Sequence, residues 1–347
     1  MSDNDDERVR VFAHLSYNNN RQHRYYIKGR KRYSYSYPNP ANNMKRRLFA
    51  TFCFLACLHA IYAQSSPSSS LHLYRTRSGH YAFSTLLNGK VLTSVMIESG
   101  IHAALVDSAF LFSHLDELDI EVRHNDMNKE MNLGGTVYRI SHLAKGMLHF
   151  GNATYDGRIL VLANYRDETE MTIPIHRLRH TFDWDSRIVM LDLEGGHMRM
   201  LTRKELREWQ GTRHKINRRS YERMPAVKTH IAFNIDGETT VIEGNFNIDL
   251  GNPMLLYLRE QSPTVGQILG ENEHLKLTVG RNRHGHIVAK TFTPKRCAIL
   301  GERFEQPIIC ITDKLRRFTT DGLIGLPFFM GRTVAFDFEN NFLHIRE

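Results

Sequence analysis

The chain is organised around the stretch FNIDLGN (residues 246–252), in which apolar residues lead into Asp249 and Gly251 follows two positions later. A strand that ends in Asp-x-Gly can present its carboxylate from a tight turn, because glycine permits the backbone angles that the turn needs. Asp and Gly are also ordinary turn residues, so a single motif of this kind is a weak signal. The stretch VMIESG (95–100) has the same pattern, with Glu98 as the carboxylate and Gly100 as the glycine.

Further correspondences show that the second motif belongs to an internal repeat. Four pairs of segments match in the same order, at separations between 145 and 151 residues. The pairs are 88–90 with 236–238, 95–100 with 246–251, 148–152 with 298–302, and 187–194 with 332–339. The first pair carries Asn-Gly and Asp-Gly, which are hairpin signals between alternating strands. The repeat predicts two lobes of one fold, each with one carboxylate turn.

The net charge of +9 lies mostly at the N-terminal end of the 347-residue chain, whose length suits about two domains. Residues 1–43 contribute +4, and Lys45, Arg46 and Arg47 contribute a further +3. The remainder carries only +2, so a general phosphate-binding face is not expected, and we expect no nucleic-acid partner.

A secretory signal is predicted over residues 44–63. Three basic residues precede an apolar run that ends at Ala63, before a polar Ser-rich stretch. The run is too short for a membrane span. Such a signal would direct the protein to the periplasm or the medium, and we expect its cleavage after Ala63. The rival interpretation is lipidation at Cys57.

Residues 1–43 have no apolar periodicity and are rich in Tyr, Asn and Arg. A signal that begins at Met44 leaves two interpretations of this segment. Translation could start at Met44, or the segment could be a disordered basic extension.

The remaining boundaries follow from composition and from the repeat. They are a Ser-rich lead at 64–79, lobe one at 80–201, a basic linker at 202–225 and lobe two at 226–347. The linker is crowded with Arg and Lys, and it is either a solvated connector that starts as a polar helix or a basic docking segment. We expect a short helix over 107–118, with Asp107 or Ser108 as its cap.

Two of the four cysteines lie in the predicted signal, which leaves Cys297 and Cys310. In an exported protein they could form one disulfide, and the alternative is two buried thiols. His284 and His286 have a spacing that a metal site could use, but no third ligand is apparent. We therefore expect no metal and no cofactor.

Taken together, the strand into Asp249 and Gly251, the later glycine-turned hairpin, the apolar 323–325 segment and the final 334–337 strand resemble the aspartic peptidases, of retropepsin-like and pepsin-like type. The resemblance covers about residues 80–347, and in detail it is to exported bacterial members with two lobes in one chain. It implies a mainly β, bilobal acid-protease-like fold of two homologous β-barrel lobes with a short helix each. The resemblance also implies a catalytic dyad of Glu98 and Asp249, support from Ser99, Gly100 and Gly251, and flaps turned at Gly134, Gly135 and Gly285.

The chemistry explains why two carboxyls are needed. Like charges a few ångströms apart do not both ionise easily, so one carboxyl keeps its proton. The ionised partner draws a proton from a shared water, which attacks the peptide carbonyl, and the protonated partner supports the developing oxyanion.

Three departures from the family's motifs affect this site, two in the Asp-Thr/Ser-Gly turns and one in the Leu-Ile-Gly segment of lobe one. Glu98 replaces Asp in lobe one, and its extra methylene should push its carboxyl across the pair. Leu250 replaces Thr or Ser in lobe two, which removes a bracing hydroxyl. Pro174 stands in lobe one where lobe two has Gly325. Catalytic geometry tolerates only about half an ångström of error.

Three functions follow as hypotheses. The first is a degenerate relative, a pseudoenzyme that binds an extended peptide or an envelope partner between the lobes. The second is an active aspartic-type endopeptidase, a hydrolase that uses Glu98 and Asp249. The third is a structural β protein of the cell envelope. The oligomeric state is not predicted.

Overall fold

The computed structural model describes residues 70–346, except 127–128, 134–135, 166–167, 218–223, 282–286 and 317. All of these residues belong to one compact unit, Ser66–Glu347. The predicted extension and signal, with Cys57, lie outside the described residues. The described part is mainly β, as the sequence predicts, and its strand pairings join all described strands into one continuous network.

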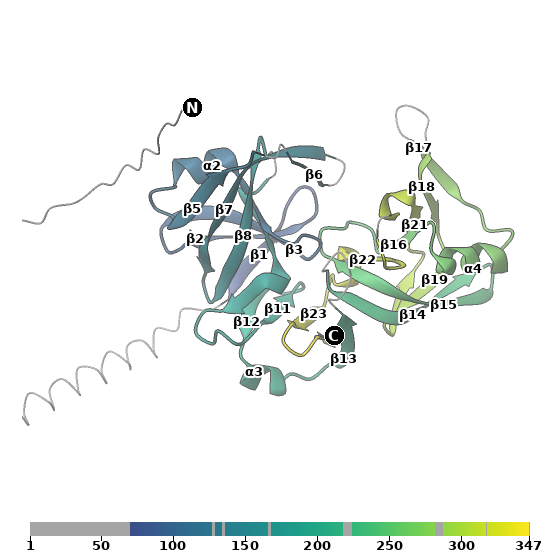
Figure 1. Cartoon of the computed structure of the whole chain (residues 1–347). Coiled ribbons are helices and arrows are strands. Elements are labelled where there is room, and N and C mark those ends of the chain that lie inside the picture. The colour runs from purple at the N-terminus through teal and green to yellow at the C-terminus, as the bar shows by residue number, and fades with distance from the viewer. Residues whose placement is uncertain are drawn as a thin grey trace, which may run out of the picture. The chain divides into compact units, whose positions relative to one another are not determined.

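An antiparallel sheet of six strands forms the middle of this network (Figure 1). Its strand order is β1 (Leu71–Arg75), β12 (His197–Leu201), β11 (Ile188–Asp192), β23 (Thr333–Asp337), β24 (Phe342–Arg346) and β13 (Thr212–Asn217). The central pair, β11 and β23, joins the two segments that the repeat had matched, with Met190 opposite Ala335. The two outermost strands lead out of the sheet, because β1 also pairs with β2 (Tyr81–Leu87) and β13 also pairs with β14 (Ala226–Ile235).

The first strand group follows β1. It contains β2, β3 (Val91–Glu98), β4 (Ala104–Asp107), β5 (Ile120–His124), β6 (Glu130–Leu133), β7 (Thr136–Phe150), β8 (Ala153–Ala163), β9 (Met171–Pro174) and β10 (Leu178–His180). In this group β3 pairs in parallel with β9, and β4 lies between β9, its antiparallel partner, and β8, its parallel partner.

The second strand group follows β13 and repeats these pairings. It contains β14, β15 (Glu238–Asp249), β16 (Leu256–Arg259), β17 (Thr278–Arg281), β18 (Ile287–Phe292), β19 (Arg296–Ile299), β20 (Glu302–Glu305), β21 (Ile309–Thr312) and β22 (Gly322–Gly325). Here β15 pairs in parallel with β22, and β16 lies between β22, antiparallel, and β21, parallel. The internal repeat read from the sequence is therefore also a repeat of strand pairing.

A tight turn joins two strands near the start of each strand group: β2 to β3 in the first group and β14 to β15 in the second. Asn88 and Gly89 have φ values of 52° and 71°, and Asp236 and Gly237 have 49° and 95°. Positive φ at both central positions gives the turn whose twist matches that of the flanking strands. The predicted hairpins β2–β3 and β14–β15 are confirmed, because their registers run without a shift up to these turns.

Helices are few and short in the part of the chain that the structure describes. They are α2 (Ser108–Ser113), α3 (Arg203–Arg207) and α4 (Pro263–Glu271), with 3-10 turns η1 (Ile175–Arg177), η2 (Asp313–Leu315) and η3 (Leu326–Phe328). Of the two predicted caps of α2, Asp107 is confirmed, since its carboxylate accepts from the Phe110 N–H at 3.0 Å, but the helix ends at Ser113 and not at residue 118. Among the described residues, no helix has the length and apolar character needed to cross a membrane.

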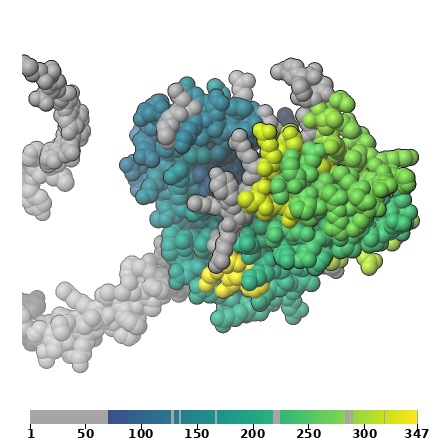
Figure 2. Space-filling model, turned by 45° about the vertical axis from the view of Figure 1, so that its right-hand side comes forward, coloured from purple at the N-terminus to yellow at the C-terminus, as the bar shows by residue number. Residues whose placement is uncertain are grey.

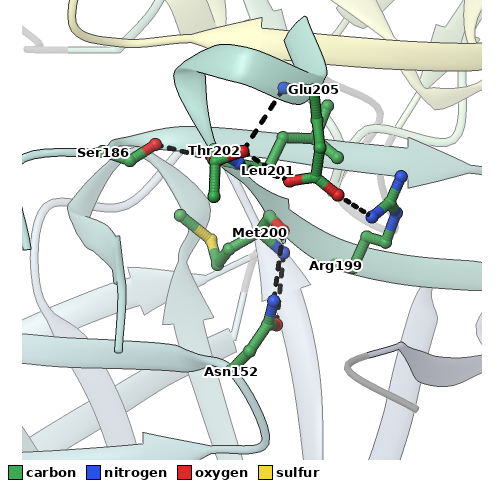
Figure 3. A network of polar contacts seen from close by, with 7 residues as sticks. All are labelled: Asn152, Ser186, Arg199, Met200, Leu201, Thr202 and Glu205. Carbon is green, nitrogen blue, oxygen red and sulfur yellow. Dashed lines mark hydrogen bonds and ion pairs between the residues drawn. The ribbon is translucent and has the colours of Figure 1, made fainter. Parts of the chain in front are cut away.

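The described part of the basic segment, residues 202–217 with 224 and 225, is more ordered than a connector. Thr202 and Glu205 form a reciprocal capping box that starts α3, and the Glu205 carboxylate also binds Arg199 at 2.6 Å (Figure 3). Beside them in the same figure, the Ser186 hydroxyl donates to the Leu201 carbonyl at 2.6 Å. Strand β13 then pairs with both β24 and β14, which the linker interpretation did not include. Its pattern is mostly polar because only Ile216 is buried in this strand.

The apolar core runs through both groups and the middle sheet. Phe83 packs on Phe150 in the first group, and Phe233 packs on Phe292 in the second. Buried residues of the C-terminal strand β23 belong to the same core cluster. Figure 2 shows the gold residues of the C-terminal strands at the lower edge of the molecule next to teal residues, in agreement with the pairing of β23 with β11 and of β24 with β13. This placement makes the C-terminal strands part of the contact that joins the two groups.

Candidate functional site

The two acidic turns occupy equivalent places in the two groups. Glu98 is the last residue of β3 and lies opposite Pro174 of β9, and Asp249 is the last residue of β15 and lies opposite Gly325 of β22. Glu98 is buried at 8% exposure, and Asp249 is partly buried. The register thus places each carboxylate at the end of a strand whose parallel neighbour also ends there.

The structure brings these two carboxyls together. Glu98 Oε1 accepts from the N–H groups of Ser99 at 2.7 Å and Gly100 at 2.8 Å, which belong to its own turn. It also accepts from the Gly251 N–H of the other turn at 3.0 Å. The same Gly251 N–H lies 3.1 Å from Asp249 Oδ1. One backbone donor therefore serves both carboxyls.

Both turn glycines leave room for the opposite carboxyl. A Cβ on Gly251 would overlap Glu98 Oε2, and a Cβ on Gly100 would lie 2.8 Å from Asp249 Oδ1. The Glu98 carboxyl thus reaches over the glycine of the second turn, the direction in which its extra methylene was expected to carry it. Any larger residue at Gly100 or Gly251 would displace a carboxyl.

Ser99 connects the two turns through its hydroxyl. Ser99 Oγ donates to the Ile248 carbonyl at 2.8 Å and accepts from the Leu250 N–H at 2.9 Å. Ser99 is completely buried. Leu250, at the matching place in the second turn, is also buried. Because it has no hydroxyl, its side chain cannot make the two equivalent hydrogen bonds to the first turn. The turns are therefore braced from one side.

Burial raises the pKa of Asp249 well above its ordinary value of 3.8, and the charge of Glu98 and a hydrogen bond with its carboxyl raise it further. The Gly251 N–H and His80 act in the opposite direction. Three N–H donors around one Glu98 oxygen suit a carboxylate anion. The arrangement therefore favours a pair with one proton, held by Asp249 and shared with Glu98.

His80 also contacts the site, which the sequence did not predict. Its Nε2 lies 2.8 Å from the Gly251 carbonyl, and its Nδ1 lies 3.0 Å from Ser78 Oγ. A carbonyl only accepts, so Nε2 carries the proton in this contact. The contact spans 171 residues of sequence, and no local motif surrounds His80 that could have indicated it.

Gly325 and Pro174 make the two sides of the site unequal. Gly325 donates to the Leu255 carbonyl at 3.0 Å, and a Cβ there would overlap the Met254 carbonyl oxygen. Only glycine allows this close approach of two backbone segments. Proline has no N–H, so Pro174 cannot make the equivalent bond.

The other candidate residues divide into those that the structure describes and those that it does not. Gly134, Gly135 and Gly285 lie outside the described residues, although the strand pairs β6–β7 and β17–β18 that flank them are present. Within the described ranges, no group of three or more His, Cys, Asp or Glu side chains could hold a metal ion.

The disulfide considered between Cys297 and Cys310 is not formed in the structure. Both thiols are free and buried. Of the two alternatives, the structure therefore has two buried thiols and no disulfide. Cys297 lies opposite Phe233 of β14, and Cys310 lies opposite Thr291 of β18, so the two side chains belong to different strand pairs. Burial raises the pKa of Cys297 to about 12 and that of Cys310 to about 11.

Comparison with known proteins gives no relative for this site. No protein-family model matches the chain, and a search of curated proteins found no significant match. Any function proposed for the Glu98–Asp249 pair therefore depends on its own geometry.

Proposed function

We propose that this protein is an aspartic peptidase-like protein that binds an extended polypeptide over the Glu98–Asp249 pair and has strongly attenuated hydrolysis. The observation that carries the proposal is the shared donor: the Gly251 N–H lies 3.0 Å from Glu98 Oε1 and 3.1 Å from Asp249 Oδ1. Carboxyls held this close share a proton, which is the starting state of aspartic peptidase chemistry.

A bilobal acid-protease-like arrangement is part of this proposal. It is supported by the repeated pairings, in which β3 with β9 matches β15 with β22. It is also supported by the brace that Ser99 makes to Ile248 and Leu250 of the other turn. A purely structural β protein would need no contact between the two carboxyls, so their contact favours the other hypotheses.

Attenuated hydrolysis follows from the way in which Glu98 is held. One of its oxygens already accepts three N–H bonds, and its carboxyl lies over Gly251. A carboxylate engaged in this way is a weaker base toward a shared water than one with a free oxygen. The missing hydroxyl at Leu250 also leaves the second turn unbraced, which lowers the precision of the pair.

Active proteolysis is the second candidate, and the raised pKa of Asp249 is the observation that favours it. A carboxyl that keeps its proton above the ordinary range can act as the acid while Glu98 acts as the base. The two candidates differ in rate rather than in the residues involved.

The experiment that tests the proposal uses a carboxymethylated, unfolded protein as the probe between about pH 3 and 7. We expect binding with little cleavage by the natural chain, and faster cleavage by the double variant Glu98→Asp with Leu250→Thr, which restores both family residues. Asp249→Asn should abolish cleavage in either background and should leave binding in place. Efficient cleavage by the natural chain that Asp249→Asn abolishes would establish the second candidate. No binding and no cleavage in any variant would overturn both.

We also propose that the protein is exported, on the basis of the apolar run that ends at Ala63. Removal of residues 44–63 should retain the protein in the cytoplasm on cell fractionation. The lipid-anchored alternative predicts that Cys57→Ser releases the protein from membranes, and the signal-peptide proposal predicts that this variant has no effect.

A further inference from the structure

A cavity of about 1190 Å³ lies apart from the Glu98–Asp249 pair and is lined by basic and amide side chains. Its basic residues come from four places: η1, the start of β11, β13 and β14. They are His176, Arg177, Arg187, Arg213, His214, Lys215 and Lys228, and the amides are Asn217, Asn245, Asn340 and Asn341. No Asp or Glu is among the described residues that line it. The cavity therefore has a formal charge of +5 on its walls with the histidines neutral.

This concentration of charge differs from the rest of the folded part, because residues from 48 onward carry only +2 in total. A like-charged cluster costs electrostatic energy unless an anion neutralises it. Lining carboxylates would be the cheapest solution, and the described lining has none. The nearby carboxylates are already used. Asp337 accepts from the backbone N–H groups of Glu339 and Asn340 in the β23–β24 turn, and Glu302, whose charge acts on His214, forms an ion pair with Arg332 at 2.7 Å.

Two of the arginines are held in place by the fold. The Arg213 guanidinium lies 3.7 Å from the centre of the Phe342 ring, and an Arg187 nitrogen donates to the His176 carbonyl at 2.7 Å. Guanidinium groups that are fixed before binding lose less entropy when they contact an oxyanion, and their planar donors match phosphate geometry.

Arg177 and Lys215 are two further positive charges on the cavity wall. Both side chains are exposed, and among the described residues neither makes an ion pair with a carboxylate. Lys228 is bound to Glu243 at 2.6 Å, so it contributes less net charge. The positions of Arg177 on η1 and Lys215 on β13 leave two cations available to a ligand in the cavity.

We propose that this cavity binds a small phosphorylated molecule. Its volume exceeds that of a single ion and lies just above the roughly 300–1,000 Å³ of typical organic-ligand pockets, which leaves room for a phosphorylated organic molecule. The arginines would bind phosphate, and the asparagine amides can both donate to and accept from hydroxyl groups. The charge is gathered in one concave place instead of along an extended face, which favours a compact anion over nucleic acid or a lipid surface. The basic segment around β13, seen in the sequence as a connector or a docking segment, would thus be one wall of a ligand site.

The test is calorimetric titration of the full chain with inorganic pyrophosphate and with fructose 1,6-bisphosphate. We expect one site per chain, and a dissociation constant at least about tenfold higher in the double variant Arg177→Gln with Lys215→Gln. The matched control is Lys204→Gln with Arg207→Gln, which removes two exposed charges on α3 outside the cavity and should leave affinity unchanged. Equal weakening by the two double variants, or no binding of either probe, would overturn the proposal.

A second measurement needs no variant. Lysine acylation of the natural chain, read by mass spectrometry, should show that pyrophosphate protects Lys215 and leaves Lys204 reactive. Equal reactivity of the two lysines with and without pyrophosphate would contradict the site. Preferential protection by nucleic acid or by anionic vesicles, with none by pyrophosphate, would assign the cavity to another class of partner and overturn the proposal.

Discussion

Glu98 and Asp249 accept hydrogen bonds from one backbone N–H, that of Gly251, at 3.0 and 3.1 Å. The two residues end equivalent strands of two groups with the same pairing pattern. Because two negative charges at this spacing repel each other strongly, the pair is stable when it holds one proton. Most of the expected behaviour of this site follows from that relationship.

Stability should depend on pH through Asp249. Its pKa is raised in the folded state, first by burial and then by Glu98, so the folded state holds this proton more tightly than the unfolded state. The resulting stabilisation is complete below the ordinary value of 3.8 and is lost as pH rises through the folded pKa. Asp249→Asn does not titrate. Urea unfolding at several pH values should therefore show the natural chain losing stability relative to Asp249→Asn as pH rises above 3.8 and through the folded pKa. A relative gain would contradict this sign.

Ser99→Ala should destabilise the fold by about 2–4 kcal/mol, because it leaves the Ile248 carbonyl and the Leu250 N–H unpaired in a buried place. Ser84→Ala is the control, since Ser84 is exposed and, among the described residues, its hydroxyl contacts only the Ser94 hydroxyl, at 3.3 Å. Denaturant unfolding of both variants gives the comparison. A loss at Ser99 as small as that at Ser84 would show that the brace is not important.

Gly325→Ala should cost at least about 2 kcal/mol of unfolding free energy, because the added Cβ would overlap the Met254 carbonyl oxygen, which is backbone and cannot rotate away. Gly266→Ala offers the opposite case, since nothing lies within 4 Å of its added Cβ in α4. That substitution should stabilise the protein by about 0.5–1 kcal/mol through helix propensity. Thermal unfolding of the two variants should move in opposite directions.

Cys297 and Cys310 should both react with iodoacetamide when the protein is unfolded without a reducing agent, because neither is in a disulfide. In the native state both should react slowly, since burial raises the pKa of each thiol to about 12 and about 11. Mass spectrometry of the peptides that contain them reads both states. Labelling that appears only after reduction would show a disulfide.

The parts of this structure that the sequence could predict are those set by short-range chemistry. The turns at Asn88-Gly89 and Asp236-Gly237 need positive φ, which these residue types tolerate, and so the two hairpins are visible in the sequence. The pairing of Glu98 with Asp249 could be expected because the same turn occurs twice in one order. A repeated motif carries information about distant contacts that a single motif does not.

The remaining features depend on contacts between distant residues. His80 reaches Gly251 across 171 positions, and nothing near it in sequence marks that contact. Strand β13 resembles a connector because its pairing strands hold it in place while only Ile216 enters the core. The sharing of one N–H by two carboxyls results from the length of the Glu98 side chain and the open space over Gly251, and both must be seen together.

The most direct test of the central claim is a carboxyl ¹³C NMR titration of Asp249 in the natural chain and in Glu98→Gln. We expect the pKa of Asp249 to lie well above 3.8 in the natural chain and to fall part of the way back when the Glu98 charge is removed, because burial still raises it. A pKa of Asp249 near its ordinary value, or one that Glu98→Gln leaves unchanged, would contradict a proton shared between the two carboxyls.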